Sequence, residues 1–315
     1  MKNGIGRKPV VLIAGPTASG KSGVALELAQ ANAGVIINAD ALQVYRELRI
    51  LSARPSVEEE RQVPHRLYGM VPASQAYSVG LWLDAGRKAI EEAWASERLP
   101  IVTGGTGLYF KAFEEGLARL PAIPAAIRQR WRERLKREGA AVLHAELARR
   151  EKEEAARLRP SDGQRIVRAL EVIEATGKPL SAWQKECEAE SYLARCRVLR
   201  LYLSPVREEL YTRINERFDR MIESEALGEI EALLALKLDA SLPAMKATGV
   251  QELGCVIAGE LRLEEACRIA KRNTRHYAKR QLTWARRNMM SWKWLSEKLM
   301  KQSMEHFLNF IRLND

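Results

Sequence analysis

Long apolar runs are missing from this sequence of 315 residues. No stretch approaches the ~20 consecutive apolar residues that a membrane-spanning helix needs, and the run Val10–Ala14 is too short for a signal peptide. With 46% apolar residues, the chain can still bury a core large enough for two compact units. We therefore expect a protein of the cytoplasm that makes no contact with a membrane.

Cysteine is scarce, with four residues, Cys187, Cys196, Cys255 and Cys267. None belongs to a C-x-x-C pair, which argues against a structural zinc site. Unpaired thiols are the ordinary state of cysteine in a reducing compartment, so we expect no disulfides. The sequence also shows no internal repeat and no low-complexity linker.

Acidic residues are absent from Arg268 to Ser296, a stretch in which basic residues alternate with His276, Tyr277 and three tryptophans. A second basic run covers residues 128–137, and Arg165 and Arg168 lie three apart on one predicted helix face. Arginine beside aromatic rings suits phosphate contact and base stacking. Any one cluster could be a solvent-exposed helix face, but three of them in a chain of net charge +11 predict a nucleic-acid partner.

A glycine-rich loop, GPTASGKS, follows the first apolar run and matches G-x-x-x-x-G-K-[ST] at every fixed position. Its two glycines let the chain curl around an anion, and successive N–H groups then lie at the positive end of the next helix. The lysine adds a mobile charge, and the serine hydroxyl is the expected ligand of Mg²⁺. The sequence therefore predicts a phosphorylated or diphosphate ligand, held by Gly15, Pro16, Thr17, Ala18, Ser19, Gly20, Lys21 and Ser22.

Apolar runs alternate with helical patterns over the first third of the chain. We predict strands at 9–14, 34–38, 65–71 and 99–105 and helices at 22–30 and 78–97. Such alternation indicates a parallel sheet with right-handed crossovers, in which ligands gather at the carboxyl ends of the strands.

The composition changes near Leu117, where residues rich in Arg, Glu and Ala begin, and a strand-like run returns at 196–204. The predicted fold is α/β, with a P-loop NTPase-like parallel sheet core over 1–117, a helical insertion over 118–195, and a last strand followed by basic helices over 196–315. We expect everything after that last strand to be helical, including an apolar and basic tail at 296–315 that packs on the core.

An acid is missing where an ATP-hydrolysing enzyme would carry one. Such an enzyme holds Mg²⁺ with an aspartate at the end of a buried strand, whereas the run LPIVTGG ends in Thr103 and two glycines. The only acid at an evident strand end is Asp40, in NADALQVYREL. Its carboxylate could cap a helix or bind near Mg²⁺, or it could be the general base beside the transferred group.

A second glycine-rich turn, TGGTGLYFKA at residues 103–112, opens a predicted helix. It could be only a tight connection between a strand and a helix. Together with the first loop, however, it suggests a cleft floored by main chain, in which Thr106 and Tyr109 offer hydroxyl groups.

These motifs together resemble one family, the tRNA dimethylallyltransferases (tRNA isopentenyltransferases). The similarity runs from about residue 10 to 290 and is carried by GPTASGKS, NADALQVYREL, VPHRLYGMVPASQAYSV, IVTGGTGLYFKA, DGQRIVRALEVIEATGKPLS and TRHYAKRQLTWAR. The resemblance implies transfer of a dimethylallyl group from dimethylallyl diphosphate to N6 of the adenosine 3′ of the anticodon in tRNA, with Mg²⁺ as cofactor. The loop would then bind the donor diphosphate rather than ATP. Because a tRNA molecule is asymmetric, we also expect the protein to act as a monomer.

The resemblance also implies roles for single residues. Lys21 would offset the negative charge of the departing diphosphate, and Ser22 would lie near Mg²⁺. Arg213, in LYTRINERF, would help to hold the diphosphate. Asp40 would accept the N6 proton. Contact with tRNA is implied for Asp40, Ala41, Leu42, Gln43, Thr106, Arg128, Gln164, Arg165, Ile166, Val167, Arg168, Lys279, Arg280 and Gln281.

Two segments depart from the family pattern. LSARPS puts Ser52 and Arg54 where Thr and Lys are usual, and TGVQE puts Val250 where an aromatic residue is common. Two rival functions stay open. One is a P-loop kinase of a nucleotide or small metabolite, which would turn over ATP, and the other is a non-enzymatic RNA-binding protein built on a nucleotide-binding fold.

Overall fold

The computed structural model describes residues 7–118, 120–186 and 191–296. The chain divides into two compact units, Met1–Glu114 with Ser191–Asp315, and Glu115–Glu190. Cys187 and all but the first residue of the predicted tail lie outside the described residues, whereas Cys196, Cys255 and Cys267 are free thiols, as expected. Within the described ranges, every helix is too short or too polar to cross a membrane.

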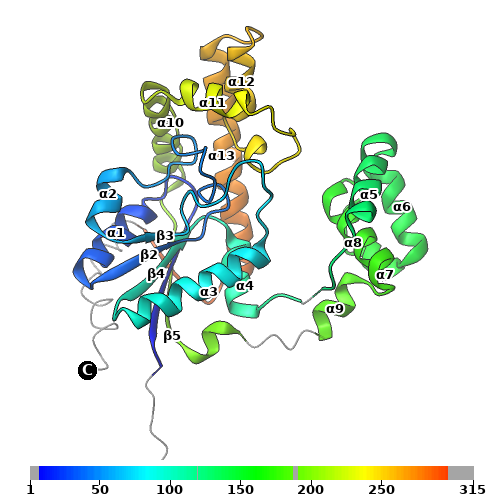
Figure 1. The fold of residues 1–315 in the computed structure, drawn as a ribbon, viewed down its shortest axis with the longest axis horizontal. Helices are drawn as coiled ribbons and strands as arrows, with labels where there is room; N and C mark the ends of the chain where they lie inside the picture. The colour runs from blue at the N-terminus through cyan, green and yellow to red at the C-terminus, as the bar shows by residue number, and fades with distance from the viewer. Residues whose placement is uncertain (1–6, 119, 187–190, 297–315) are drawn as a thin grey trace, which may run out of the picture. The chain divides into compact units, whose positions relative to one another are not determined.

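Six parallel strands form the sheet of the first unit, in the order β3-β2-β4-β1-β5-β6 (Figure 1). This confirms the predicted α/β class with a parallel sheet. The carboxyl ends of β1, β2 and β4 lie side by side, since Ala14 is opposite Gly104 and Asn38 is opposite Thr103. The strands are β1 (Pro9–Ala14), β2 (Gly34–Asn38), β3 (His65–Arg66), β4 (Leu99–Gly104), β5 (Arg197–Leu203) and β6 (Lys293–Leu295).

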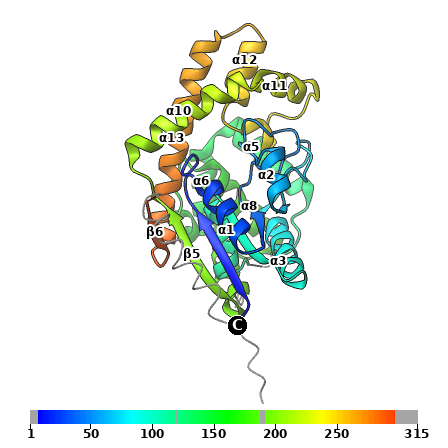
Figure 2. The same ribbon diagram turned by 90° about the vertical axis from the view of Figure 1, so that its left-hand side faces the viewer.

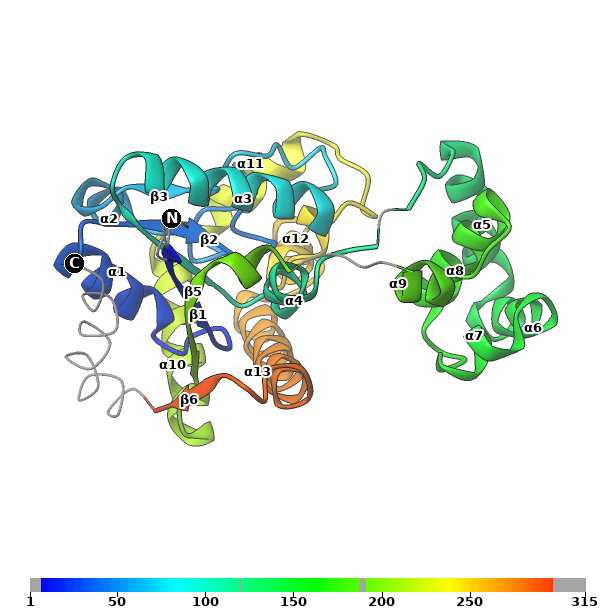
Figure 3. The same ribbon diagram turned by 90° about the horizontal axis from the view of Figure 1, so that it is seen from below.

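Helices cover both faces of this sheet (Figure 3). Val11 and Ile13 of β1 pack against Val24 and Leu28 of α1, while Trp82 of α3 is fully buried and donates its indole N–H to the Asn38 carbonyl at the end of β2. The helices of this unit are α1 (Lys21–Ala31), α2 (Val57–Gln62), α3 (Val79–Ala95), α4 (Gly107–Glu115), α10 (Arg207–Glu223), α11 (Ala226–Ala235), α12 (Val250–Ile257) and α13 (Leu263–Asn288), with 3₁₀ turns at Tyr192–Arg195 and Ala244–Lys246.

Two secondary-structure predictions were wrong. The run 65–71 forms only the short β3, because Leu67 and Gly69 take positive φ angles of 66° and 55° and turn the chain away from the sheet. The region after β5 is not all helical, since β6 extends the sheet beyond β5 (Figure 2). Trp294 of β6 packs on the ring of Tyr202, with centroids 4.2 Å apart, so the tertiary contact stabilises a strand of three residues.

Helices α10 to α13 pack around a second core that also takes in residues 44–48 after β2. Glu229 of α11 accepts hydrogen bonds from the main-chain N–H groups of residues 49–51, at 2.6 to 3.0 Å. The departures from the family pattern lie around this core. Val250 is buried in it, the Ser52 hydroxyl donates to the Leu48 carbonyl, and the Arg54 guanidinium lies 3.9 Å from Glu60. Each therefore has a structural contact.

The second unit consists of helices alone. Its core is formed by Trp131, Leu143, Leu147, Ile166 and Leu170. The indole N–H of Trp131 donates to Glu174 at 2.9 Å. The helices are α5 (Ala125–Glu138), α6 (Ala140–Arg150), α7 (Lys152–Ala156), α8 (Gly163–Thr176) and α9 (Leu180–Glu186).

Candidate active site

The phosphate loop connects β1 to α1. Gly20, at the N-cap of α1, takes a left-handed φ of 86° and has no side chain, so the first N–H groups of the helix are left for a ligand. Lys21 begins α1 and donates from Nζ to the Pro16 carbonyl at 3.3 Å, which folds its side chain back over the loop. Ser22 is exposed beside it. This local geometry is that of an anion site at the positive end of a helix.

Two distant helices reach the same loop. Arg217 of α10 donates to Thr17 Oγ1 at 2.5 Å, and Gln281 of α13 accepts a hydrogen bond from the Thr17 N–H at 2.9 Å. The Gln281 amide nitrogen donates in turn to the Gly105 carbonyl at 2.8 Å. One glutamine therefore joins the phosphate loop to the second glycine-rich turn.

Asp40 lies at the same edge of the sheet and is held in a defined turn. The Asn38 side chain accepts from the Asp40 N–H at 2.8 Å, and Asp40 Oδ1 accepts from the Leu42 N–H at 3.0 Å. The other carboxylate oxygen, Oδ2, lies next to Gly105, since a methyl group there would come within 3.2 Å of it and would overlap the Gln281 amide. Glycine at 105 thus allows the carboxylate, the loop and α13 to meet.

The site carries more positive than negative charge. Burial lowers the pKa of Lys21 to about 8, with Asp40 opposing the shift and Arg217 adding to it. Burial likewise lowers the pKa of Arg217 to about 10, again opposed by Asp40. Two partly desolvated cations around one carboxylate favour an anionic ligand, because such a ligand restores the charge balance that burial disturbs.

Three tyrosines share the electrostatic field of Asp40. The pKa values of Tyr68, Tyr109 and Tyr277 are raised, first by burial and second by the Asp40 charge. All three therefore stay neutral hydroxyl groups near the carboxylate. Tyr109 is buried and stacks on Trp82 with ring centroids 4.2 Å apart, so its ring belongs to the core while its hydroxyl group is within electrostatic reach of the site.

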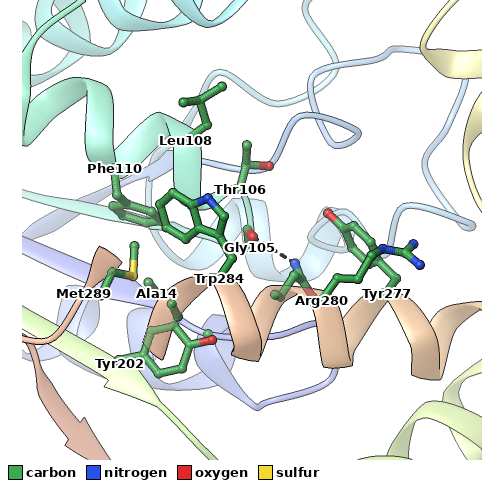
Figure 4. A pocket seen from close by; sticks show the side chains of 14 residues that line it. Ala14, Gly105, Thr106, Leu108, Phe110, Tyr202, Tyr277, Arg280, Trp284 and Met289 are labelled. Atoms are coloured by element: carbon green, nitrogen blue, oxygen red, sulfur yellow. Dashed lines mark hydrogen bonds between the residues drawn. The ribbon is translucent and has the colours of Figure 1, made fainter. Parts of the chain in front are cut away.

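A cavity of about 250 Å³ adjoins the loop (Figure 4). Its walls come from the ends of β1, β4 and β5, the start of α4 and the carboxyl-terminal half of α13. Gly107 makes room for one wall, because a methyl group at that position would overlap the ring of Trp284. The lining is mostly apolar and consists of Ala14, Gly15, Gly105, Thr106, Gly107, Leu108, Phe110, Tyr202, Tyr277, Arg280, Gln281, Trp284, Ala285 and Met289.

The structure brings together most of the predicted site residues of the first unit. Residues 15–22, Asp40 and Gln281 meet at the strand ends, and Thr106 Oγ1 accepts from the Ala41 N–H at 2.9 Å. The Gln43 side chain donates to the carbonyls of residues 52 and 53, at 3.0 and 2.7 Å, so it braces the loop after β2. Lys279 and Arg280 are exposed on α13.

The remaining predicted tRNA contacts belong to the helical unit. Arg128 is exposed on α5, and Gln164 and Arg165 are exposed at the start of α8. Ile166 and Val167, in contrast, are buried in the core of this unit, with exposed fractions of 0% and 5%. Their side chains therefore support α8, and the neighbouring polar side chains are the ones that face solvent.

Arg217 was missed by the sequence analysis, which named Arg213. Both arginines flank the buried positions of α10, one helical turn apart, so periodicity does not distinguish them. Arg213 pairs with Glu209 at 3.7 Å, whereas Arg217 contacts the loop. The expected stacking role also needs correction for one of the three carboxyl-terminal tryptophans. Trp292 is buried against Phe110, so its ring is part of the core.

Comparison with known proteins shows which sequences this chain resembles. A family model described as IPP transferase matches residues 43–288, and one described as isopentenyl transferase matches residues 8–71. A tRNA dimethylallyltransferase of Rhodopseudomonas palustris is 50% identical over 307 residues, which cover 97% of this chain and 94% of that protein. A tRNA dimethylallyltransferase of Nitrobacter hamburgensis is 51% identical over 291 residues, 92% of each chain.

Solved structures show the same fold. The tRNA isopentenylpyrophosphate transferase of Bacillus halodurans superposes with a TM-score of 0.68 at 31% identity, over 98% of this chain and 97% of that one. A eukaryotic dimethylallyltransferase acting on tRNA gives a TM-score of 0.79 at 27% identity, over 92% of this chain and 74% of that one.

Proposed function

Because the chain belongs to the IPP transferase family of tRNA dimethylallyltransferases, we infer that it transfers a dimethylallyl group from dimethylallyl diphosphate to N6 of the adenosine 3′ of the anticodon in tRNA. Diphosphate is released. The observation that carries this inference is the similarity over nearly the whole chain, together with a phosphate loop whose Lys21 lies in the electrostatic field of Asp40 and Arg217. No finding favours the alternative of a kinase.

The chemistry requires a strong electrophile, because the N6 lone pair of adenine is delocalised into the ring. Ionisation places positive charge on the allylic carbon and negative charge on the departing diphosphate. The loop N–H groups, Lys21 and Arg217 would stabilise that leaving charge, which grows towards the transition state. The contact of Arg217 with Thr17 supports this role, and the role of Arg213 stays a prediction.

Asp40 is the proposed general base. Its Oδ2 lies beside Gly105, while Oδ1 is fixed by the Leu42 N–H, so one oxygen is left to orient N6–H and take its proton as the C–N bond forms. The target base must leave its stack to reach this depth. Exclusion of water by the buried Tyr109 and the half-buried Tyr68 and Tyr277 would protect the allylic cation from hydrolysis.

This site can bind Mg²⁺ only if the substrate supplies some of the ligands. Among the residues that the structure describes, no group of three His, Cys, Asp or Glu side chains could hold a metal ion. The exposed Ser22 hydroxyl at the start of α1 is the proposed protein ligand, and donor phosphate oxygens would supply others, a common arrangement for Mg²⁺. When bound, the ion would add to the neutralisation of the leaving diphosphate.

Transfer RNA is the proposed partner, and one chain supplies every proposed contact, so a monomer suffices. The exposed Lys279 and Arg280 of α13 and Arg128 of α5 would meet phosphates. On α8 the proposed contacts come from Gln164, Arg165 and Arg168. Arg165 pairs with Asp162 at 3.3 Å, an exposed ion pair that a phosphate can replace.

Incubation of the protein with radiolabelled dimethylallyl diphosphate, Mg²⁺ and bulk tRNA tests the function. We expect label in tRNA, at N6 of the adenosine next to the anticodon. Consumption of ATP with no label in tRNA would support the kinase instead. Binding of tRNA with neither reaction would support a non-enzymatic RNA-binding protein.

Donor use should depend on the charge of Lys21. Lysine is cationic below its pKa, so kcat/KM for the donor should be constant below pH 8 and fall above it, since the pKa in the free protein is about 8. At pH 9 we expect a loss of about tenfold relative to pH 7, with kcat nearly unchanged, because bound diphosphate holds the proton on Lys21. The Lys21→Arg variant stays charged and should lack this alkaline decline. The same decline in that variant would assign it to another group.

Gln281 is a proposed positioning residue, because its amide holds two main-chain groups of the site. Gln281→Glu should raise KM for the donor about tenfold at pH 8, since an ionised carboxylate cannot donate to the Gly105 carbonyl and repels diphosphate. A protonated glutamic acid can both accept and donate, so activity should recover as the pH falls. Gln281→Leu, which has no polar group, should show the loss without recovery, and an equal pH response of both variants would contradict the role.

A further inference from the structure

Asn38 is a fully buried polar residue next to the proposed base, and it has no role in the assignments above. A buried primary amide needs partners for two N–H donors and one carbonyl oxygen. Here main-chain groups supply all of them. Oδ1 accepts from the Asp40 N–H at 2.8 Å, and Nδ2 donates to the carbonyls of Asp40 and Leu67 at 3.0 and 3.1 Å. One side chain therefore bonds to both main-chain groups of Asp40.

The main chain leaves the sheet at this point, so strand pairing does not fix Asp40. The preceding residue, Ala39, is still held by β4, because its N–H donates to the Thr103 carbonyl at 2.7 Å. A methyl group at Gly104 would come within 2.1 Å of the Ala39 carbonyl, which shows how closely the two segments approach. At Asp40 the Asn38 amide takes the place of a neighbouring strand.

The third bond of the amide reaches a different segment. Leu67 takes a left-handed φ of 66°, which a residue with a side chain keeps only where its surroundings hold it. The bond from Asn38 to the Leu67 carbonyl is one such restraint, and the bond from the Gly69 N–H to the Gln43 carbonyl, at 2.9 Å, is another. The turn at 67–69 and the segment that carries Asp40 are thus tied together through Asn38.

The direction of the Asp40 carboxylate depends on this main chain. Oδ1 accepts from the Leu42 N–H, and Oδ2 lies next to Gly105. A general base must stay within hydrogen-bonding reach of the proton that it takes, and a misplacement of about 1 Å can cost about 100-fold in rate. Rotation of the peptide groups on either side of Asp40 would move both carboxylate oxygens, and the Asn38 amide opposes that rotation.

We propose that Asn38 is a positioning residue, which holds the main chain of Asp40 so that the carboxylate is aimed at the N6 amine. The proposal rests on the proposed function, in which Asp40 is the base. Asn38 would act only through Asp40, so its loss should lower kcat and leave the binding of donor diphosphate to the loop unchanged. An amide that only stabilised the end of β2 would instead change the melting temperature, with no dependence on the residue at position 40.

Steady-state kinetics of Asn38→Leu in two backgrounds tests the proposal. In the parent chain we expect kcat to fall about 30-fold, with KM for the donor and for tRNA within about threefold. In the Asp40→Asn chain, which has lost the base, the same substitution should lower kcat by less than about threefold, because residues that act as one unit are not additive. An equal fall in both backgrounds, or an unchanged kcat in Asn38→Leu, would overturn the proposal. An unchanged kcat in Asp40→Asn would contradict the base itself, and the positioning role with it.

Asn32→Leu is the matched control, since Asn32 lies before the amino end of β2 and its amide donates to the Leu28 carbonyl at 2.8 Å. Its kcat should stay within about twofold of the parent. Asn38→Ser keeps the proposal testable where Asn38→Leu fails to fold, because a hydroxyl group can still accept from the Asp40 N–H. We expect Asn38→Ser to lose about fivefold in kcat in the parent chain and nothing in the Asp40→Asn chain. The same loss in both chains would overturn the proposal.

Discussion

Replacing Asp40 with asparagine should lower kcat about 100-fold or more, the usual contribution of a positioned general base. Asparagine can keep the hydrogen bond from the Leu42 N–H, so the turn after β2 is retained, but its amide cannot take a proton from N6. The KM for the donor should not rise, because the lost negative charge opposed the binding of diphosphate next to Lys21 and Arg217. Steady-state kinetics with both substrates varied separates these effects.

Asp219→Asn is the matched control. The Asp219 carboxylate lies on α10, away from the loop, and pairs with the Lys271 ammonium at a distance of 2.5 Å. Its kcat should stay within about twofold of the parent, as for most surface substitutions. Tight binding of tRNA should persist in the Asp40→Asn and Asp40→Ala variants. Full turnover by either of them at saturating substrate would remove Asp40 from the role of base.

Replacing Arg217 with glutamine should lower kcat/KM for the donor about 100-fold, a typical result of losing one charge-stabilising donor. The Arg217 side chain is half-buried, stays cationic at neutral pH with a pKa of about 10, and donates a hydrogen bond to the Thr17 hydroxyl of the loop. Its loss would remove a charge that favours the departing diphosphate and would loosen the loop. Affinity for tRNA should change little, because the loss is confined to the donor site.

Arg213→Gln distinguishes the two candidate arginines of α10. Arg213 lies one turn earlier and pairs with Glu209, so its replacement should cost less than about fivefold. A loss equal to that of Arg217→Gln would support the role that the family resemblance gives to Arg213. Circular dichroism of both variants checks that helix α10 is intact.

Several features of the fold could be predicted because local chemistry decides them. The β-branched runs bounded by glycine and proline form β1, β2 and β4 within a residue of the predicted bounds. The loop motif needs only its own glycines and the helix that follows it. The strand β6 was missed because three residues carry no local strand signal, and pairing with β5 is what stabilises it.

Local sequence specifies the groups at the strand ends, since a phosphate loop, one strand-end aspartate and a second glycine turn are each contiguous segments whose conformation depends on near neighbours. Which distant side chains complete the site depends instead on tertiary packing. Arg217 and Gln281 reach Thr17 from positions 200 and 264 residues away, and helical periodicity gives the face of a residue but not its depth. Depth depends on how α10 and α13 pack against the sheet, and that packing places Arg217 on the loop.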